Sequence, residues 1–315
     1  MNVASKRKIV DVHLHFYDHQ QNRHEFLDSE DKVFHALVGD YSSLPRTYRF
    51  DDYLADSTDV EIEGLVWNEF LSTDPVKEVR WAQDLAERLP VPVALVGLVD
   101  LLAPDLERTL DVYSQCSHLV AVRQHLGWDE QNPLRRFAPR GDMLTDPHLL
   151  QGLKTLGKYK FKCSLEMFAP QLKDFRGVVE KNLDISFWIP VIGWPLDLSK
   201  AGFAQWKRDM QALTTHPNVH VSVSALECVF GMDWAVADAA PWIDTLFELF
   251  GGGRIMFGSH RPLCKLSRTF PNPYRAYEKF VEQLTPSEQD AVFRKNAAAW
   301  FFGEMKAASP NVHSA

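Results

Sequence analysis

Cysteine is scarce in this 315-residue chain and is scattered along it. The four cysteines, Cys116, Cys163, Cys228 and Cys264, form no CxxC pair. A thiolate metal site and a disulfide framework are therefore not expected, and a reducing cytoplasm is the predicted location.

Long apolar runs and an excess of positive charge are also missing. No stretch reaches the ~18 apolar residues that a bilayer-spanning helix needs. The basic residues 6–8 precede a short apolar pair, Ile9 and Val10, which is not a secretory signal. The 34 lysines and arginines are outnumbered by 42 aspartates and glutamates, so the net charge is −8. We expect neither a membrane nor a nucleic-acid partner.

The chain does contain a regular alternation of short apolar runs and helical patterns. It is 45% hydrophobic and 24% charged, as globular proteins are. Alternating strands and helices predict a parallel sheet. Eight strands in about 300 residues predict a (β/α)₈ or TIM barrel, with residues 1–315 as one domain. The predicted strands are 9–15, 64–68, 93–99, 119–123, 161–166, 185–189, 219–223 and 255–258.

Several helices have recognisable boundaries. Asp74 is a good N-cap and Pro75 suits the first helical position, so a helix is predicted to begin there. Another is predicted to follow Asp105. Further helices are expected at 205–214 and at 241–250, the latter ended by three glycines.

The segment 17–50 is longer than the other connections and has no strong period. Long connections in compact domains tend to be functional. We expect this segment to lie over the barrel mouth as a lid; the alternative is an irregular surface insertion. The tail 306–315 is expected to be frayed.

Two histidines alternate at the end of the first predicted strand. His13 and His15 point to the same side, because a strand has a period of two. Such a pair can hold one metal ion or one anionic substrate. The alternative is a pair of core histidines whose ring nitrogens bind backbone groups.

Nearly every predicted strand ends in polar residues. In a barrel of this type the chemistry lies at the C-terminal ends of the strands. These residues together predict a polar catalytic cup. The candidates are His13, His15, Trp67, Asn68, Glu69, Asp100, Arg123, His125, Glu166, Ser222, Ser224, Glu227 and His260.

Several short motifs occur in one order along nearly the whole chain. The motifs are DxHxH at 11–15, GLVD at 97–100, APD at 103–105, VRQ at 122–124, HPNV at 216–219, RIMFGS at 254–259 and NA at 296–297. In this combination the chain resembles the amidohydrolase superfamily, and within it the amidohydrolase-related family that includes 2-pyrone-4,6-dicarboxylate lactonase and sugar-acid lactonases. The resemblance implies a (β/α)₈ fold and hydrolase activity.

The chain departs from that family at two positions. The family usually ends its sixth strand in Asp-His-x-Gly, whereas residues 190–193 read PVIG, so Val191 occupies the histidine position. The eighth strand usually ends in Ser-Asp-x-Pro, whereas residues 259–262 read SHRP. His260 thus replaces the aspartate that usually accepts the proton of the attacking water and is often a metal ligand.

A rearranged metal site is the first of three interpretations. His13, His15, His260 and Glu166 would hold one divalent ion, with Zn²⁺ as the first choice. The ion would lower the pKa of a bound water toward ~7, and Glu166 or His260 would relay the proton.

Two interpretations need no metal. In one, His260 acts as the base, and His13 and His15 with Arg123 stabilise an oxyanion or bind a carboxylate. The resemblance permits this, because the pyrone dicarboxylate lactonases are thought to work without metal. In the other, the barrel binds a ligand without catalysis, for which Val191 is the main argument.

Other side chains are assigned to the substrate. Arg123 can bind a substrate carboxylate bidentately, or form an ion pair inside the barrel with Asp100 or Glu166. His125, Arg49, Trp67 and Tyr48 are further substrate-binding candidates. Glu227 and Trp234 follow the seventh strand, where a substrate wall would lie, but surface packing is the favoured interpretation of both.

The function that follows is hydrolysis of a C–O bond in a small, anionic lactone or carboxylic ester. A small molecule is therefore the expected partner. A non-hydrolytic barrel that binds a ligand and a decarboxylase of the same superfamily are the alternatives. The oligomeric state stays open, with a homo-oligomer among the alternatives.

Overall fold

Eight parallel strands form the wall of a barrel in the computed structural model, which describes residues 6–303. Neighbours in the sheet follow chain order, as the (β/α)₈ prediction requires. All eight predicted strands are confirmed, with ends that differ by a few residues. They are β1 (Arg7–Leu14), β4 (Val60–Asn68), β5 (Val93–Leu98), β6 (Leu119–His125), β7 (Lys162–Glu166), β8 (Phe187–Ile189), β9 (Val219–Val223) and β10 (Ile255–Phe257).

The barrel closes where the end of β1 meets the chain that follows β10. The backbone N–H of His260 donates to the carbonyl of His13 at 2.5 Å, and the N–H of His15 donates to the carbonyl of Arg261 at 2.8 Å. Gly258 permits this approach, because a Cβ there would lie 2.6 Å from the Cβ of His13. The seam thus places His13 and His15, near the start of the chain, beside His260, near its end.

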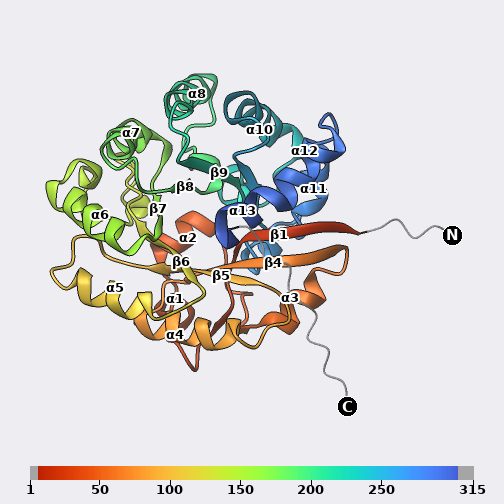
Figure 1. Ribbon diagram of the computed structural model, residues 1–315. Coiled ribbons are helices and arrows are strands. Elements are labelled where there is room, and N and C mark those ends of the chain that lie inside the picture. Colours follow the sequence, from red (N-terminus) through yellow and green to blue (C-terminus); the bar gives the residue numbers. More distant parts are fainter. Residues whose placement is uncertain (1–5, 304–315) are drawn as a thin grey trace, which may run out of the picture.

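Helices form a ring around the strands (Figure 1). Asp74 caps its helix as predicted, since its carboxylate accepts from the N–H of Lys77 at 3.0 Å. Two predicted starts, 205 and 241, are five residues late: those helices begin at Lys200 and Val236, and Pro241 lies inside the second one. The helices outside the barrel are α4 (Pro75–Ala86), α5 (Leu106–Ser114), α6 (Pro147–Tyr159), α7 (Leu172–Lys181), α8 (Lys200–Leu213), α9 (Leu226–Phe230), α10 (Val236–Phe250), α11 (Tyr274–Phe280), α12 (Pro286–Asp290) and α13 (Asn296–Phe302).

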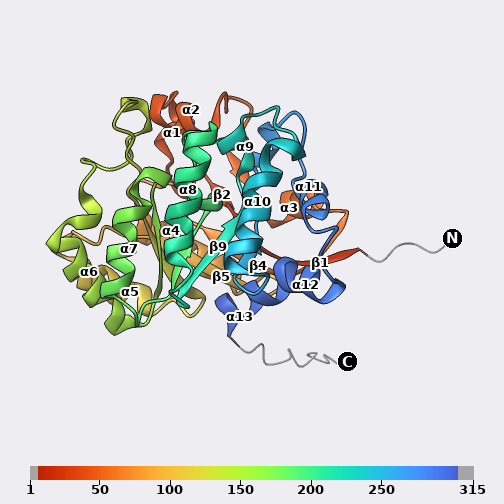
Figure 2. The ribbon, with the colours of Figure 1, turned by 90° about the horizontal axis from the view of Figure 1, so that it is seen from above.

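One end of the barrel is plugged by apolar side chains. Val12, Val66 and Trp188 fill the interior and pack with Trp300 and Phe301 of α13. Figure 2 shows α13 at the end of the barrel opposite to α1 and α2. The open, polar end is therefore the one at which the strands terminate, as expected for this fold.

The segment 17–50 is structured. It contains β2 (Tyr17–Asp18), α1 (Glu25–Asp28), α2 (Lys32–Val38) and β3 (Thr47–Tyr48), and α3 (Phe50–Asp56) follows. These elements are too short to show a period in the sequence. Aromatic rings hold the segment to the loop after β4: Phe26 lies 4.3 Å from Phe34 and 5.0 Å from Phe70, between ring centroids.

The tail predicted to be frayed, 306–315, lies outside the described residues. Within residues 6–303, no helix has the length and apolar character needed to cross a membrane.

Candidate active site

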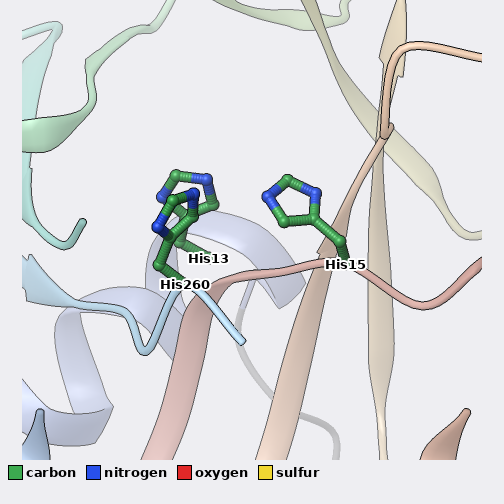
Figure 3. Close-up of side chains that lie close together, drawn as sticks. All are labelled: His13, His15 and His260. Atoms are coloured by element: carbon green, nitrogen blue, oxygen red, sulfur yellow. The ribbon is translucent and has the colours of Figure 1, made fainter. Parts of the chain in front are cut away.

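Three histidines from opposite ends of the chain meet at the open end of the barrel. His13 and His15 come from the end of β1, and His260 follows β10. One ring nitrogen of each lies within 4.8 Å of the others. The ring centroids are 4.6 Å apart for His13 and His260, and 5.1 Å apart for His13 and His15 (Figure 3). The predicted pair on the first strand is thus part of a triplet.

Each imidazole uses its Nδ1 for a hydrogen bond within the protein. The Nδ1 of His15 lies 3.0 Å from the carbonyl oxygen of Asn68, so this nitrogen donates. The Nδ1 of His260 lies 2.7 Å from Oε1 of Glu227, and that of His13 lies 2.9 Å from the hydroxyl of Ser224. This leaves Nε2 of each ring as the nitrogen available to a ligand.

Burial keeps two of these rings neutral. Removal from water, with repulsion from His260 next, lowers the pKa of His13 and His15 well below the usual value. A neutral imidazole has a free lone pair on one nitrogen, which is the form that binds metals.

The donor set fits a divalent metal such as Zn²⁺. Three imidazole nitrogens are a common zinc-binding set. Metal-binding histidines usually donate their other ring N–H to a carboxylate or a backbone carbonyl, as His260 and His15 can here. Glu166, predicted as the fourth ligand, is not part of this cluster. It is held by Arg123 instead, and Glu227 is the carboxylate beside His260.

A second polar group lies on the adjoining wall of the cup. Arg123 forms ion pairs with Glu69 and, at 2.7 Å, with Glu166. His125 lies 2.8 Å from Glu69 through Nε2 and 3.5 Å from Glu166 through Nδ1. Burial acts to raise the pKa of Glu69, but the positive charge of Arg123 and the His125 hydrogen bond lower it below its usual range. The internal ion pair considered for Arg123 is therefore the one observed, with Glu166 and not Asp100.

Two glutamates named among the strand-end residues have roles in the site that the sequence did not assign. Glu227 was expected to pack at the surface, but it is 3% exposed and bonded to His260, so that expectation is wrong. Glu69 follows β4 directly and is fully buried beside Arg123. Its position after a predicted strand end indicated the polar cup, but not its pairing with Arg123. Trp234 is buried against Phe270 and does not line the cavity.

Three predicted substrate-binding residues do not line the cavity. The side chain of Arg49 is 61% exposed and pairs with Asp18. Tyr48 is buried and donates to Asp56 at 2.8 Å. Trp67 points outward from β4 and donates to the carbonyl of Phe16 at 2.8 Å. His125 and Arg123, in contrast, do line the cavity.

The position where the family usually has a histidine is apolar and tightly packed. Val191 is buried in a cluster with Phe168, Trp194 and Ala225. Its backbone is left-handed, with φ at 50°, which is costly for a β-branched residue. No ligand to the histidine cluster comes from this position.

One cavity is lined by the histidine cluster together with Arg123, His125 and Glu166, and apolar side chains form most of its walls. The cavity encloses about 60 Å³, which is room for about four waters. Phe34 and Leu37 of α2 contribute to the wall, so the segment 17–50 does contact this cavity. The apolar lining is Phe34, Leu37, Val38, Phe70, Leu71, Phe137, Met167, Phe168, Trp194 and Leu263.

Two curated proteins resemble the chain over much of its length. An uncharacterized protein, y4mH, from Sinorhizobium fredii is 26% identical over 295 residues, which cover 93% of this chain and 98% of the relative. The L-fucono-1,5-lactonase of Burkholderia ambifaria is 22% identical over 230 residues, covering 71% of this chain and 76% of the relative.

A solved structure supports the fold, and a family model supports the assignment. An amidohydrolase from Burkholderia multivorans, crystallised with bound zinc, superposes with a TM-score of 0.75 at 20% identity and covers 93% of this chain and 99% of that one. The model of the family described as Amidohydrolase matches residues 10–303. With nearly its whole length matched, the chain belongs to the amidohydrolase family of enzymes.

Proposed function

We propose that the protein hydrolyses a lactone or carboxylic ester, with one divalent ion, preferably Zn²⁺, held by His13, His15 and His260. The observation that carries the proposal is the hydrogen bonding of the three imidazoles. Their Nδ1 atoms are all occupied, which leaves three Nε2 atoms for one ligand. The family assignment and the lactonase relative are consistent with this reaction.

Different residues of the chain orient the histidines, accept the proton of the water and position the acceptor. A bound divalent ion would supply Lewis acidity for a carbonyl and for a water. Ser224 and Glu227 orient the rings of His13 and His260 through Nδ1. Glu166 lines the cavity and is an acceptor when ionised. We therefore propose that Glu166 accepts the proton released by the attacking water. Arg123 holds that carboxylate in place.

A metal-free route to the same reaction is favoured by one contact. The carboxylate of Glu227 lies 2.7 Å from Nδ1 of His260, and such a pair orients an imidazole to act as a general base. In this route His260 takes the proton through Nε2. His13 would donate through Nε2 to the developing charge on the carbonyl oxygen, with its Nδ1 accepting from the hydroxyl of Ser224.

In this proposal the segment 17–50 also forms a lid over the cavity. A cavity of about 60 Å³ is smaller than a substituted lactone ring needs, since typical ligand sites measure about 300 Å³ or more. Phe34 and Leu37 place α2 against the cavity. We therefore propose that α2 moves outward to admit substrate and returns to exclude water.

One experiment separates the alternatives. The protein is purified without chelator, its metal content is measured, and hydrolysis of L-fucono-1,5-lactone and of simple δ-lactones and esters is followed. The His260→Ala variant is compared with His35→Ala, a control whose side chain is 46% exposed on α2.

Each outcome has a defined meaning. About one equivalent of metal that is lost in His260→Ala but kept in His35→Ala supports the metal site. Activity that survives EDTA and disappears in His260→Ala supports the metal-free route. Absence of turnover with every lactone and ester overturns the proposed reaction and leaves a decarboxylase or a binding protein.

A further inference from the structure

We propose that the substrate is uncharged and that, outside its reacting lactone or ester group, it carries an apolar alkyl or aryl group. This inference rests on the proposed hydrolysis of a lactone or ester at the histidine cluster. It concerns the rest of the molecule, which must lie against the cavity walls. An anionic substrate, expected from Arg123 in the sequence, is the alternative.

The first argument is that each of the three side-chain nitrogens of Arg123 already donates to an acceptor within the protein. Its Nε donates to the carboxylate of Glu69, its Nη1 to Glu166 at 2.7 Å, and its Nη2 to the backbone carbonyl of Glu69 at 3.0 Å. The side chain is 5% exposed. A carboxylate from solution would have to displace a carboxylate that is already in place.

The second argument is the charge of the wall itself. Among the described residues that line the cavity, Arg123 is the only lysine or arginine. Its single positive charge faces the two negative charges of Glu69 and Glu166. If His125 were also positively charged, the net charge of Arg123, His125 and the two glutamates would be zero. Glu166 lines the cavity beside Arg123, and like charges at close range are a strong means of exclusion.

The third argument is the apolar surface around the histidines. Phe70 stacks on His15 with ring centroids 4.5 Å apart and an interplanar angle of 25°. Phe34, Phe137, Phe168 and Trp194 continue this surface from four other parts of the chain. An ionised group placed against such walls would lose its hydration without a partner, whereas an apolar group gains from burial.

A matched pair of ligands tests the inference without turnover. Both 4-phenylcyclohexanone and 4-oxocyclohexanecarboxylate present a ring carbonyl but no ester bond to cleave. Their affinities are measured by calorimetry with the wild-type protein. We expect the phenyl ketone to bind about tenfold more tightly or better. Equal or tighter binding of the carboxylate ketone would overturn the inference.

A charge-removing variant tests the physical cause. Glu166→Gln leaves Arg123 with one carboxylate partner, so affinity for the carboxylate ketone should rise relative to the phenyl ketone by about tenfold. Glu107→Gln is the control, because that side chain is 64% exposed and pairs with Lys158 outside the cavity. An unchanged ratio in Glu166→Gln would contradict the assignment of Glu166 as the neutralising partner.

The outcome can be separated from that of the proposed function. A protein that prefers the phenyl ketone but cleaves no lactone keeps the substrate class and loses the proposed reaction. If lactones are cleaved, a phenyl-substituted δ-lactone should exceed 2-pyrone-4,6-dicarboxylate in kcat/KM by about tenfold. The reverse order would keep the reaction and overturn the substrate class.

Discussion

The backbone N–H of His260 donates to the backbone carbonyl of His13 at 2.5 Å, across the seam that closes the barrel. The same seam that completes the wall therefore brings together two of the three histidines in the cluster. A barrel can close only if its first and last strands meet, so this placement is a consequence of the fold. Gly258, just before this contact, lacks the side chain that would hold the strands apart.

Gly258→Ala should disrupt the histidine cluster more than it disrupts the fold. The new methyl group would lie 2.6 Å from the Cβ and 2.7 Å from the N of His13, so the seam must shift. Overpacking of this kind costs about 1–3 kcal/mol of the free energy of unfolding. We expect a lower melting temperature and loss of most bound zinc, measured by thermal unfolding and elemental analysis.

The matched control for that variant is Gly177→Ala, in α7. A Cβ there meets no atom within 4 Å, and alanine is favoured over glycine in a helix by about 0.5–1 kcal/mol. Gly177→Ala should keep its zinc and melt at the same temperature or higher. Full zinc content in Gly258→Ala would show that the cluster does not depend on the seam.

Glu227→Gln should weaken metal binding without unfolding the protein. The variant removes the charge that faces Nδ1 of His260 but keeps a hydrogen-bond acceptor of the same shape. Loss of such a partner typically reduces metal affinity by about 10–100-fold. Competition with a coloured chelator measures the affinity, and Glu248→Gln, an exposed position, is the control. Equal affinity in both variants would argue against a metal held by His260.

The sequence predicts the strands better than the contacts among the side chains of the site. The short apolar runs predict all eight strands, and the period of two correctly places His13 and His15 on one side. The same period could have excluded Trp67: Val66 fills the barrel interior, so its neighbour must face outward.

The partners of the site residues were harder to predict for a physical reason. Glu227 reaches His260 because Ala225 adopts a left-handed backbone, with φ at 51°, at the start of α9. Alanine in this conformation has no sequence signal, since glycine and asparagine usually occupy it. Arg123 likewise presented two reasonable interpretations, and its ion pairs with Glu69, after β4, and Glu166, at the end of β7, decide between them.

Glu78→Gln should stabilise the protein increasingly as the pH rises. Glu78 is 1% exposed, and burial followed by the charge of Glu69 raises its pKa well above the usual value. Below the unfolded-state pKa of about 4.3, both states hold the proton and the variant gains little. Above it, the unfolded wild-type chain ionises first, so wild-type stability falls by at most about 1.4 kcal/mol per pH unit.

Urea unfolding at pH 4 and pH 8 measures this difference for Glu78→Gln. The amide keeps an acceptor for the N–H of Phe70, which now bonds Oε1 of Glu78 at 3.1 Å. Glu107→Gln, at an exposed position, should show no comparable trend. A gain that is the same at both pH values would mean that Glu78 does not hold its proton in the folded state.

Leu37→Ala should widen the entrance and change which lactones are accepted. Leu37 is a half-buried residue of α2 that lines the cavity, so its truncation should cost less than the 2–5 kcal/mol typical of buried leucines. We expect kcat/KM for a phenyl-substituted δ-lactone to rise by about tenfold, with little change for unsubstituted δ-valerolactone. His35→Ala, on the same helix but outside the cavity lining, is the control. Equal effects of the two variants on both lactones would show that helix stability, and not the wall formed by Leu37, controls entry.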